Sequence, residues 1–364
     1  MTNLRVLIII PILPPYVGGA ATYYSNLLKY LSKSVDVTVL TRAFPGEKVF
    51  LLQRNLRILR ILPPINYRTR YLTYLGDLFI IPVAIMLLRA RYRITVAQLH
   101  GVTFSLTPIG LKVLQVLRIP TILDVRGPFF GRTIIGKNVN YYVVASKTIA
   151  NKLALLGVQR EKIVVTGTPL EDMPIESLEP LVERRTHTRL LYVGGLEALK
   201  GVDKLLGAFK LASKHSECDF SLMLIGEGSM LEKCKKFIKQ DEYGAKLVLA
   251  GKLPHHQTLN IIRQCDVLVQ PSGLEFTRSL LEALYFKKPV IAVRNADIED
   301  VVKDHVNGLL ANDGSEQELA KCIVEVCNPS LRLQLSKGFL QPLITWNDVV
   351  KKLVHVYQLA AKTK

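Results

Sequence analysis

The stretch from Pro271 to Val293 (PSGLEFTRSLLEALYFKKPVIAV) constrains the fold more than any other part of the chain. It combines a Pro-Ser loop, a helix predicted to begin near Thr277, a turn with two lysines, and an apolar strand from Pro289 to Val293. A helix that returns the chain to a buried strand is a building unit of α/β folds. The stretch therefore predicts an α/β protein with a site at the start of this helix.

The start of the predicted helix is suited to bind an anion. The first backbone N–H groups of a helix have no partner inside it and point, with the helix dipole, at what lies in front. We therefore expect a diphosphate near Arg278, Ser279 and Leu280. One turn further on, the carboxylate of Glu282 can accept both hydroxyls of a ribose. A nucleoside diphosphate fits both requirements; the alternative is an ordinary exposed helix with surface glutamates.

The same stretch resembles the donor-site signature of glycosyltransferase family 4, whose members are retaining enzymes with the GT-B fold. In that signature Pro-Ser is followed by Glu, seven residues and Glu-Ala, and Pro271-Ser272 and Glu282-Ala283 match it, as does Lys288–Ala292. Only six residues separate Glu275 from Glu282, so the spacing departs from the pattern at Glu275. The resemblance implies that Glu282 holds the ribose and that Glu275 contacts a hydroxyl of the donor sugar.

Positive charge is concentrated in the first half of the 364 residues. Residues 1–165 contain 22 Lys and Arg against 5 Asp and Glu, a net charge of +17, whereas residues 166–364 contain 26 against 25, a net charge of +1. A solubilising charge would be spread over both halves, so we expect the first half to meet a polyanion, either a nucleic acid or an anionic membrane surface. No recognisable nucleic-acid-binding module accompanies the charge, so we expect no nucleic acid partner.

Two stretches of this basic half mix arginines with apolar residues. Gln53–Leu62 places Arg54, Arg57 and Arg60 at steps of three among leucines and isoleucines, and the eleven apolar residues Leu78–Leu88 are followed by further arginines. Eleven residues are too few to cross a bilayer, which takes about 20. Two interpretations remain: a helix packed in the core, or one that lies in the membrane interface with arginines at the headgroups. No signal peptide is expected, because the first apolar run is short and ends at prolines.

The first half also alternates apolar runs with helical patterns, as a parallel sheet requires. Arg5–Ile10 reads as a buried strand, and it is followed by Gly18 and Gly19 and by a helical pattern from Ala21 to Leu31. The resemblance implies that the paired glycines let the backbone approach the donor phosphates and the acceptor. The alternative is a plain turn.

Two residues at strand ends are candidates to contact the donor sugar. The predicted strand Thr121–Val125 ends where the family usually has His-Gly, with the His touching the sugar, and here Arg126 has that position. An arginine can donate hydrogen bonds to sugar or phosphate oxygens but cannot act as a base. His100, which ends the predicted strand Thr95–His100, can take the place of the family's histidine; the alternative is a histidine that is simply satisfied at a strand end.

Residues 169–188, with three prolines and no periodic pattern, are interpreted as a linker between an N-terminal domain of residues 1–168 and a C-terminal domain of residues 189–345. The second domain opens with a strand, Gly194 and Lys200-Gly201. This resembles the family segment Gly-Arg-Leu followed by Lys-Gly, in which Arg and Lys neutralise the donor diphosphate. Lys200 is present, whereas Gly195 replaces the arginine; Arg278 and Arg294 are candidates to supply the missing charge.

Three further features complete the prediction. Residues 346–364 contain an amphipathic helix, which in the family crosses back to the N-terminal domain. The five cysteines lack a CxxC spacing and are interpreted as reduced core thiols of a cytosolic protein. His255 and His256 have no acidic or cysteine partner at metal-ligand spacing, and we interpret them as polar loop residues, so no metal site is expected.

The resemblance and the repeated strand–helix pattern together predict an α/β fold of the GT-B type, with two Rossmann-like domains facing each other across a cleft. The implied reaction is transfer of a sugar from a nucleotide diphosphate sugar, with retention, to a lipid-linked or glycan acceptor at the cytosolic, anionic face of a membrane. No cofactor is implied, because helix N–H groups and cations stabilise the leaving diphosphate. The predicted catalytic residues are Lys200, Glu275, Arg126 and His100. The predicted donor-binding residues are Gly18, Gly19, Gly194, Lys200, Arg278, Ser279, Leu280 and Glu282.

Two alternative functions stay open on the sequence alone. One is a GT-B sugar-nucleotide epimerase, which needs acid and base carboxylates and no acceptor groove. The other is a degenerate, non-catalytic protein that binds nucleotide or lipid. The second is suggested by three departures from the family pattern, at Gly195, Arg126 and Asn295.

Overall fold

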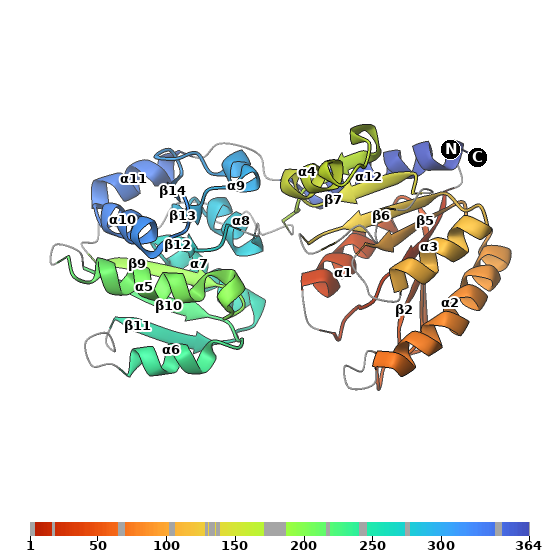
Figure 1. Ribbon diagram of the computed structural model, residues 1–364, viewed down its shortest axis with the longest axis horizontal. Coiled ribbons are helices and arrows are strands. Elements are labelled where there is room, and N and C mark those ends of the chain that lie inside the picture. The colour runs from red at the N-terminus through yellow and green to blue at the C-terminus, as the bar shows by residue number, and fades with distance from the viewer. Residues whose placement is uncertain are drawn as a thin grey trace. The chain divides into compact units, whose positions relative to one another are not determined.

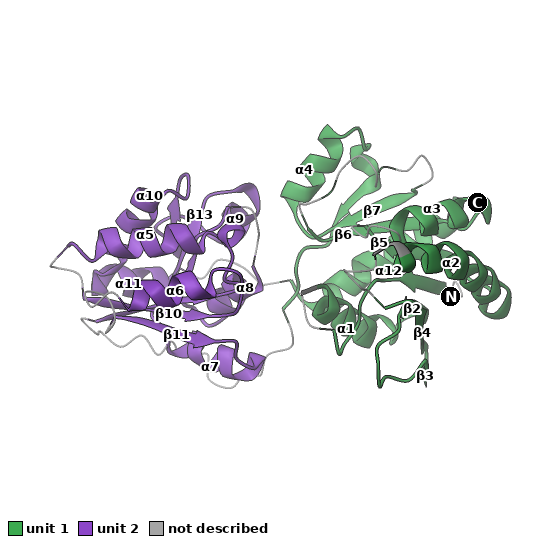
Figure 2. Ribbon diagram, turned by 60° about the horizontal axis from the view of Figure 1, so that its bottom comes forward, with its two compact units in different colours: residues 1–172, 344–364 green, residues 173–343 purple. Residues whose placement is uncertain are grey.

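The computed structural model describes residues 4–16, 19–64, 70–101, 106–127, 130, 135, 139–170, 187–215, 219–239, 246–273, 277–338 and 344–363. The chain divides into two compact units, unit 1 with Met1–Asp172 and Ile344–Lys364, and unit 2 with Met173–Leu343 (Figure 2). Gly18, Glu275 and most of the predicted linker lie outside the described residues. Each unit has its own sheet covered by helices (Figure 1).

Unit 1 is built on an eight-stranded sheet. Its strands are β1 (Arg5–Ile9), β2 (Asp36–Arg42), β3 (Phe50–Gln53), β4 (Leu56–Leu62), β5 (Val96–His100), β6 (Thr121–Val125), β7 (Tyr141–Val144) and β8 (Ile163–Val165). They lie in the order β3-β4-β2-β1-β5-β6-β7-β8, and every neighbouring pair is parallel except β3 with β4. The strand order reverses between β1 and β5, so the carboxyl ends of these strands form the ligand-binding edge expected of such sheets.

Helices cover both faces of this sheet, which is why its central strands are continuous apolar runs. Val6 and Ile8 of β1 pack in one core with α1 (Gly19–Leu31) and α12 (Trp346–Lys362). Leu7 and Ile9 pack in the other core with α2 (Arg70–Tyr92), α3 (Leu106–Val116) and α4 (Lys147–Leu155). The amphipathic helix predicted near the end of the sequence is therefore α12, and it is a core element of unit 1.

The arginine-rich stretch Gln53–Leu62 is a hairpin that the sequence did not predict. Arg54 lies in its turn, whereas Arg57 and Arg60 lie on β4, where residues three apart point to opposite faces. Arg57 Nη1 is 2.5 Å from an oxygen of Asp36, and Arg60 donates to the carbonyl of Pro14 at 2.9 Å. Arg57 and Arg60 therefore point to opposite faces of β4 and pair with groups of unit 1.

The apolar run Leu78–Leu88 is only part of α2, which has 23 residues. Its segment Leu72–Tyr92 has 21 residues and is, by length and composition alone, sufficient to cross a membrane. The apolar run Leu78–Leu88 is therefore part of a helix that is longer than the sequence pattern indicates. Gly76 and Asp77 interrupt the apolar pattern without ending the helix, which also contains Pro82.

Unit 2 contains a six-stranded, fully parallel sheet. Its strands are β9 (Thr188–Val193), β10 (Phe220–Ile225), β11 (Leu247–Gly251), β12 (Val267–Gln270), β13 (Val290–Val293) and β14 (Gly308–Ala311). The order β11-β10-β9-β12-β13-β14 reverses between β9 and β12. One face packs on helices α5 (Val202–Ala212), α6 (Leu231–Ile238), α10 (Glu316–Val326) and α11 (Pro329–Lys337). The other packs on α7 (His255–Gln264), α8 (Arg278–Tyr285) and α9 (Ala296–Val301).

The described cysteines are free, buried thiols, as expected from their spacing. They are Cys234, Cys265, Cys322 and Cys327. Burial raises the pKa of Cys265 and of Cys322 to about 12, so neither forms a thiolate near neutral pH. Cys218 lies outside the described residues.

Candidate active site

Two loops of unit 2 meet where the strand order reverses. β9 is followed by Gly194, and β12 is followed by Pro271-Ser272. Ser279, at the start of α8, donates from Oγ to the carbonyl of Val193 at 3.1 Å, and Ser272 Oγ donates to the carbonyl of Leu199 at 3.1 Å. Motifs that are far apart in the sequence therefore lie together at the carboxyl edge of the sheet, where parallel sheets of this order bind ligands.

The backbone conformation at position 201 explains why a glycine follows Lys200. The φ of Gly201 is +74°, and a Cβ at this position would lie 2.5 Å from the carbonyl oxygen of Pro271. Glycine alone tolerates both the conformation and the close approach. Lys200 ends the short 3-10 helix η3 (Ala198–Lys200). Both its neighbours, Leu199 and Gly201, touch the loop that leads to α8, so Lys200 is held at the predicted donor site.

α8 begins where the sequence predicts. Thr277 is its N-cap, and its Oγ1 accepts a long hydrogen bond of 3.4 Å from the N–H of Leu280 and donates to Gln270 Oε1 at 2.6 Å. The Leu280 N–H, one of the groups predicted to bind the diphosphate, thus donates to the N-cap of α8. A phosphate oxygen that bound this N–H would take the place of the Thr277 hydroxyl.

Glu282 is buried behind the start of α8, with only 3% of its surface exposed. Arg278, one turn earlier on the same helix face, places Nε 3.0 Å from Glu282 Oε1. His255 Nε2 lies 2.8 Å from the same oxygen. The side chains of Arg278 and His255 are 30% and 45% exposed, so a ligand can reach the partners of a carboxylate that is itself nearly inaccessible.

His255 was missed as a site residue, and its interpretation as a loop residue is wrong. It is the first residue of α7, and the local sequence signal for that helix start is Pro254 directly before it. Its partner Glu282 lies on another helix, so spacing along the chain does not show the contact.

The two arginines considered as replacements at Gly195 are both paired with carboxylates. Arg278 pairs with Glu282, and Arg294 pairs with Glu299 at 2.7 Å and with Asp304 at 3.0 Å. Contact between Lys200 and the diphosphate stays a prediction.

Asn295, one of the three departures from the family pattern, has a structural role. Its Oδ1 accepts from the N–H groups of Asp297 and Ile298 as the N-cap of α9, and its Nδ2 donates to the carbonyl of Gly273 at 2.9 Å. It thus fixes the loop that follows Ser272 to the next strand–helix turn.

The corresponding edge of unit 1 carries a buried polar network centred on Asp124, which is fully buried at the end of β6. Asp124 accepts from Arg126 Nε at 2.7 Å, from Tyr24 Oη at 2.9 Å and from Gln98 Nε2 at 3.0 Å. Arg126 also donates to the carbonyl of Gly167 at 3.0 Å. Burial by itself would lower the pKa of Arg126, but the charge of Asp124 raises it above its ordinary value.

Arg126 is held mainly by protein groups. Its remaining described hydrogen bonds, from Nη2 to Thr166 Oγ1 at 3.0 Å and to Tyr23 Oη, bring the N–H groups in use to four of five. Its guanidinium also lies over the Tyr23 ring, 3.9 Å from the centroid. Contact between Arg126 and the donor sugar stays a prediction.

His100, at the end of β5, belongs to the same network. Its Nδ1 lies 3.1 Å from Tyr24 Oη, and burial lowers the pKa of His100, so the imidazole is neutral near pH 7. Tyr357 of α12 donates to Gln98 Oε1. The structure thus brings His100 and Arg126 together, as predicted for two strand ends, through Tyr24 and Asp124. Tyr24, Gln98 and Tyr357 were missed, because in the sequence they look like ordinary helix and strand positions.

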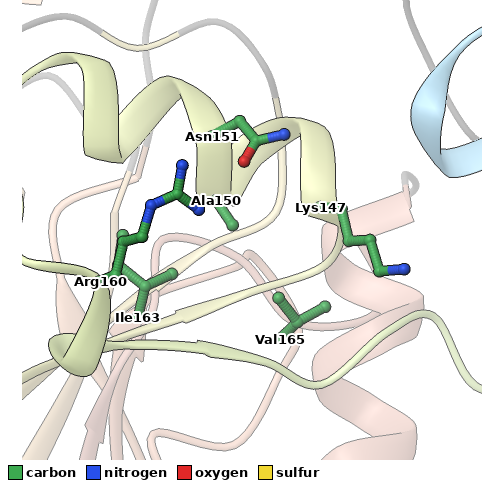
Figure 3. Close-up of a pocket in the computed structure, with 6 residues that line it drawn as sticks. All are labelled: Lys147, Ala150, Asn151, Arg160, Ile163 and Val165. Carbon is green, nitrogen blue, oxygen red and sulfur yellow. The ribbon is translucent and has the colours of Figure 1, made fainter.

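A pocket of about 500 Å³ adjoins the unit 2 loops and is lined by Leu199, Gly201, Pro271 and Ser272 among others. Its size is in the range of ligand sites, and both neighbours of Lys200 lie at or in its wall. Figure 3 shows a smaller pocket of about 270 Å³ between α4 and β8 of unit 1, which contains no predicted site residue. Within the described residues, no three His, Cys, Asp or Glu side chains form a metal-binding group.

Sequence comparison assigns both units. Residues 17–171 match the family described as Glycosyltransferase Family 4, and residues 176–337 match the family described as Glycosyl transferases group 1. The chain belongs to these glycosyltransferases. This glycosyltransferase is 24% identical to an uncharacterized glycosyltransferase of Methanocaldococcus jannaschii, over 94% of its own length and 95% of the relative.

Solved structures agree with this assignment. The glycosyltransferase matches the apo form of a lipopolysaccharide outer core galactosyltransferase with a TM-score of 0.74 and 16% identity, over 98% and 99% of the two chains. It matches HepE of Anabaena, solved in complex with UDP, with a TM-score of 0.72 and 16% identity, over 98% and 100%. Likeness at this identity shows the fold alone. The predicted GT-B fold class and the predicted enzyme class are confirmed.

Proposed function

We propose that this glycosyltransferase takes its sugar from a nucleotide diphosphate sugar and transfers it with retention at the anomeric carbon. The observation that carries the proposal is the start of α8, where the capped N-terminus, buried Glu282 and the Lys200 loop converge at the carboxyl edge of unit 2. The presence of UDP in the HepE structure supports a uridine nucleotide as the first donor to test.

The proposed roles follow from where charge develops. When the bond between the anomeric carbon and the diphosphate oxygen breaks, negative charge appears on the diphosphate. Lys200 and the N–H groups of Ser279 and Leu280 stabilise that charge, and because the interaction strengthens in the transition state it accelerates the reaction. Glu282 accepts the ribose hydroxyls, while Arg278 and His255 keep its carboxylate oriented. These roles require no metal.

We propose a lipid-linked or glycan acceptor that meets unit 1 at the cytosolic face of a membrane. The net charge of +17 in residues 1–165 supports an anionic surface as the partner of this unit. This chain shares its fold with a galactosyltransferase of the lipopolysaccharide outer core, and that likeness supports an acceptor that carries a lipid.

The test is to incubate the protein with a panel of nucleotide sugars, with and without extracted lipid, and to measure nucleotide release. We expect release from one donor that depends on the lipid extract. Lys200→Ala is the matched variant: it should lower kcat more than it raises the donor KM. Release from Lys200→Ala equal to that of the parent would contradict the proposed role of Lys200. Binding without turnover would favour the non-catalytic alternative, and interconversion of the sugar without an acceptor would favour the epimerase.

A further inference from the structure

The outer face of α2 is an apolar surface that is left exposed by the part of unit 1 that the structure describes. Large apolar side chains on it are between 40% and 70% exposed: Leu72, Leu75, Leu78, Phe79, Val83, Met86 and Leu87. Most follow one another at steps of three or four, so they lie on one helix face. Water-soluble surfaces rarely expose so many apolar groups together, and such patches mark contacts with proteins or membranes.

The edge strand β3 extends this surface. Phe50 and Leu52 are 46% and 63% exposed, and they pair with Leu59 and Arg57 of β4. Side chains of directly paired residues lie on the same face of a sheet. Leu59 packs in the core that α2 shares, and the Arg57 guanidinium lies 4.6 Å from the ring centroid of Tyr92 in α2. Phe50 and Leu52 therefore lie on the sheet face that α2 covers, and we call them, with the outer residues of α2, the apolar platform.

A buried ion pair fastens α2 to the sheet. Arg42 at the end of β2 donates to both oxygens of Asp77, at 2.9 and 2.7 Å, and the two side chains are 2% and 0% exposed. The inner residues of the helix belong to the core of unit 1; they are Ile81, Ala84, Ile85 and Leu88. If α2 left the sheet, Arg42 would lose the counter-charge of Asp77 in a buried place and the core would open. The helix is therefore held on unit 1, although its length is sufficient to cross a bilayer.

Basic residues flank the platform. Exposed Lys48 and Arg54 bracket β3, and exposed Arg91 and Arg93 follow the apolar face of α2. Apolar side chains with basic residues beside them are typical of helices that lie in the interface of an anionic membrane. A second copy of the chain would instead bring two strongly positive surfaces together.

We propose that the apolar platform lies in the interfacial layer of an anionic membrane, with α2 parallel to the surface and fastened to unit 1 by Arg42 and Asp77. The inference rests on the proposed membrane acceptor and names the surface that meets it. It does not depend on the chemistry at α8. The docking element is the outer face of α2, whereas Arg57 and Arg60 pair within unit 1.

Vesicle flotation tests the proposal with the full chain. We expect the protein to float with phosphatidylcholine vesicles that contain phosphatidylglycerol, and binding to fall as salt is added. The double variant Phe79→Glu/Leu87→Glu should bind at least about tenfold less. Leu155→Glu is the matched control, because Leu155 is 88% exposed at the end of α4 and lies outside the platform; it should bind like the parent. An equal loss of vesicle binding in Phe79→Glu/Leu87→Glu and in Leu155→Glu would overturn the proposal. So would a parent protein that does not bind anionic vesicles at low salt.

Tryptophan placement gives a second readout that does not rely on loss of binding. The sequence has one tryptophan, Trp346, which is 2% exposed in the core of unit 1. The fluorescence emission of a tryptophan introduced by Phe79→Trp should shift to the blue when anionic vesicles are added, and brominated lipid should quench it. One introduced by Leu155→Trp should show neither effect. The reverse pattern would place the membrane contact on another face.

Three outcomes separate this inference from its rivals. Alkaline carbonate should release the bound protein; retention after carbonate would show a spanning helix. Sedimentation should show the same association state for the parent and for Phe79→Glu/Leu87→Glu; dissociation of a parent dimer by these changes would show that a second copy covers the platform. UDP binding tests unit 2 separately, so vesicle binding without UDP binding would contradict the proposed donor site and leave this inference standing.

Discussion

Both units place a carboxylate at the same kind of sheet edge, but its surroundings differ. Asp124 in unit 1 is fully buried, and its partner Arg126 is only 11% exposed. Glu282 in unit 2 is equally inaccessible, but its partners Arg278 and His255 are 30% and 45% exposed. A carboxylate whose partners are nearly buried is part of the core, whereas one whose partners reach solvent lies where a ligand can approach it. The comparison distinguishes a buried polar network at the Asp124 edge from a carboxylate with solvent-exposed partners at the Glu282 edge, where we propose that the donor binds.

The largest effect should come from Asp124→Asn. It leaves the Arg126 guanidinium buried without its counter-charge, which costs about 3–5 kcal/mol of unfolding free energy. Trp346 lies in the core of unit 1, so its fluorescence during denaturant unfolding reports on this unit. A loss under about 1 kcal/mol would show that the Asp124 network is not structural and would remove the contrast with Glu282.

Glu282→Ala should weaken UDP binding by about 1.5–3 kcal/mol, the range for hydrogen bonds to a charged group. Unfolding of unit 1, followed by Trp346, should not change. Titration calorimetry measures the affinity, and Glu232→Ala, an exposed glutamate of α6, is the control. Unchanged affinity in Glu282→Ala would mean that the ribose is held elsewhere.

Thr277→Ala should destabilise unit 2 by about 1 kcal/mol, because it removes the N-cap of α8. It also frees the Leu280 N–H for a phosphate oxygen, so UDP affinity should stay within about twofold of the parent. Hydrogen exchange at α8 measures the first effect and calorimetry the second. An affinity loss as large as that of Glu282→Ala would show that the hydroxyl of Thr277, rather than the backbone, contacts the nucleotide.

The smallest effect concerns pH. Burial lowers the pKa of His100 in the folded chain below the value of about 6.5 expected in the unfolded chain. Between the two values the unfolded state binds more protons, so unit 1 loses stability as the pH falls through about 6.5. His100→Gln has no imidazole to protonate, so its unfolding free energy should not fall in this way. The difference in unfolding free energy between the parent and His100→Gln should therefore shrink as the pH is lowered from 7.5 to 5. Parallel curves over this range would show that His100 is solvated rather than part of the buried network.

The sequence predicts well those elements whose signal is local. The strand Thr121–Val125 is observed at the predicted residues, and the predicted strands Arg5–Ile10 and Pro289–Val293 are each observed to within one residue, since each is an apolar run with clear limits. The start of α8 follows from Thr277 in the same way, because an N-cap acts on its own first turn.

The errors arise where a charge is balanced by a distant residue. The charged Asp77 breaks the apolar pattern of α2 and hides the true length of the helix. Its partner Arg42 lies 35 residues away, so the local sequence does not show that the charge is balanced. Likewise His255 and Glu282 are 27 residues apart, on different helices. Local patterns carry no information on such pairs, so the partners of Asp77 and Glu282 could not be predicted from the sequence.

The position of α12 has a consequence for how the protein is made. Ile344–Lys364 belongs to unit 1, yet the ribosome synthesises it after the whole of unit 2. Trp346, Leu353 and Tyr357 fill the core beside α1, so until they emerge the nascent unit 1 has one face of its sheet only partly covered, by α1. All residues of unit 2 are therefore synthesised before unit 1 is complete. Unit 1, although it begins the chain, is the last to complete its core. During that interval the newborn chain presents its apolar strands to chaperones and to its neighbours on the polysome.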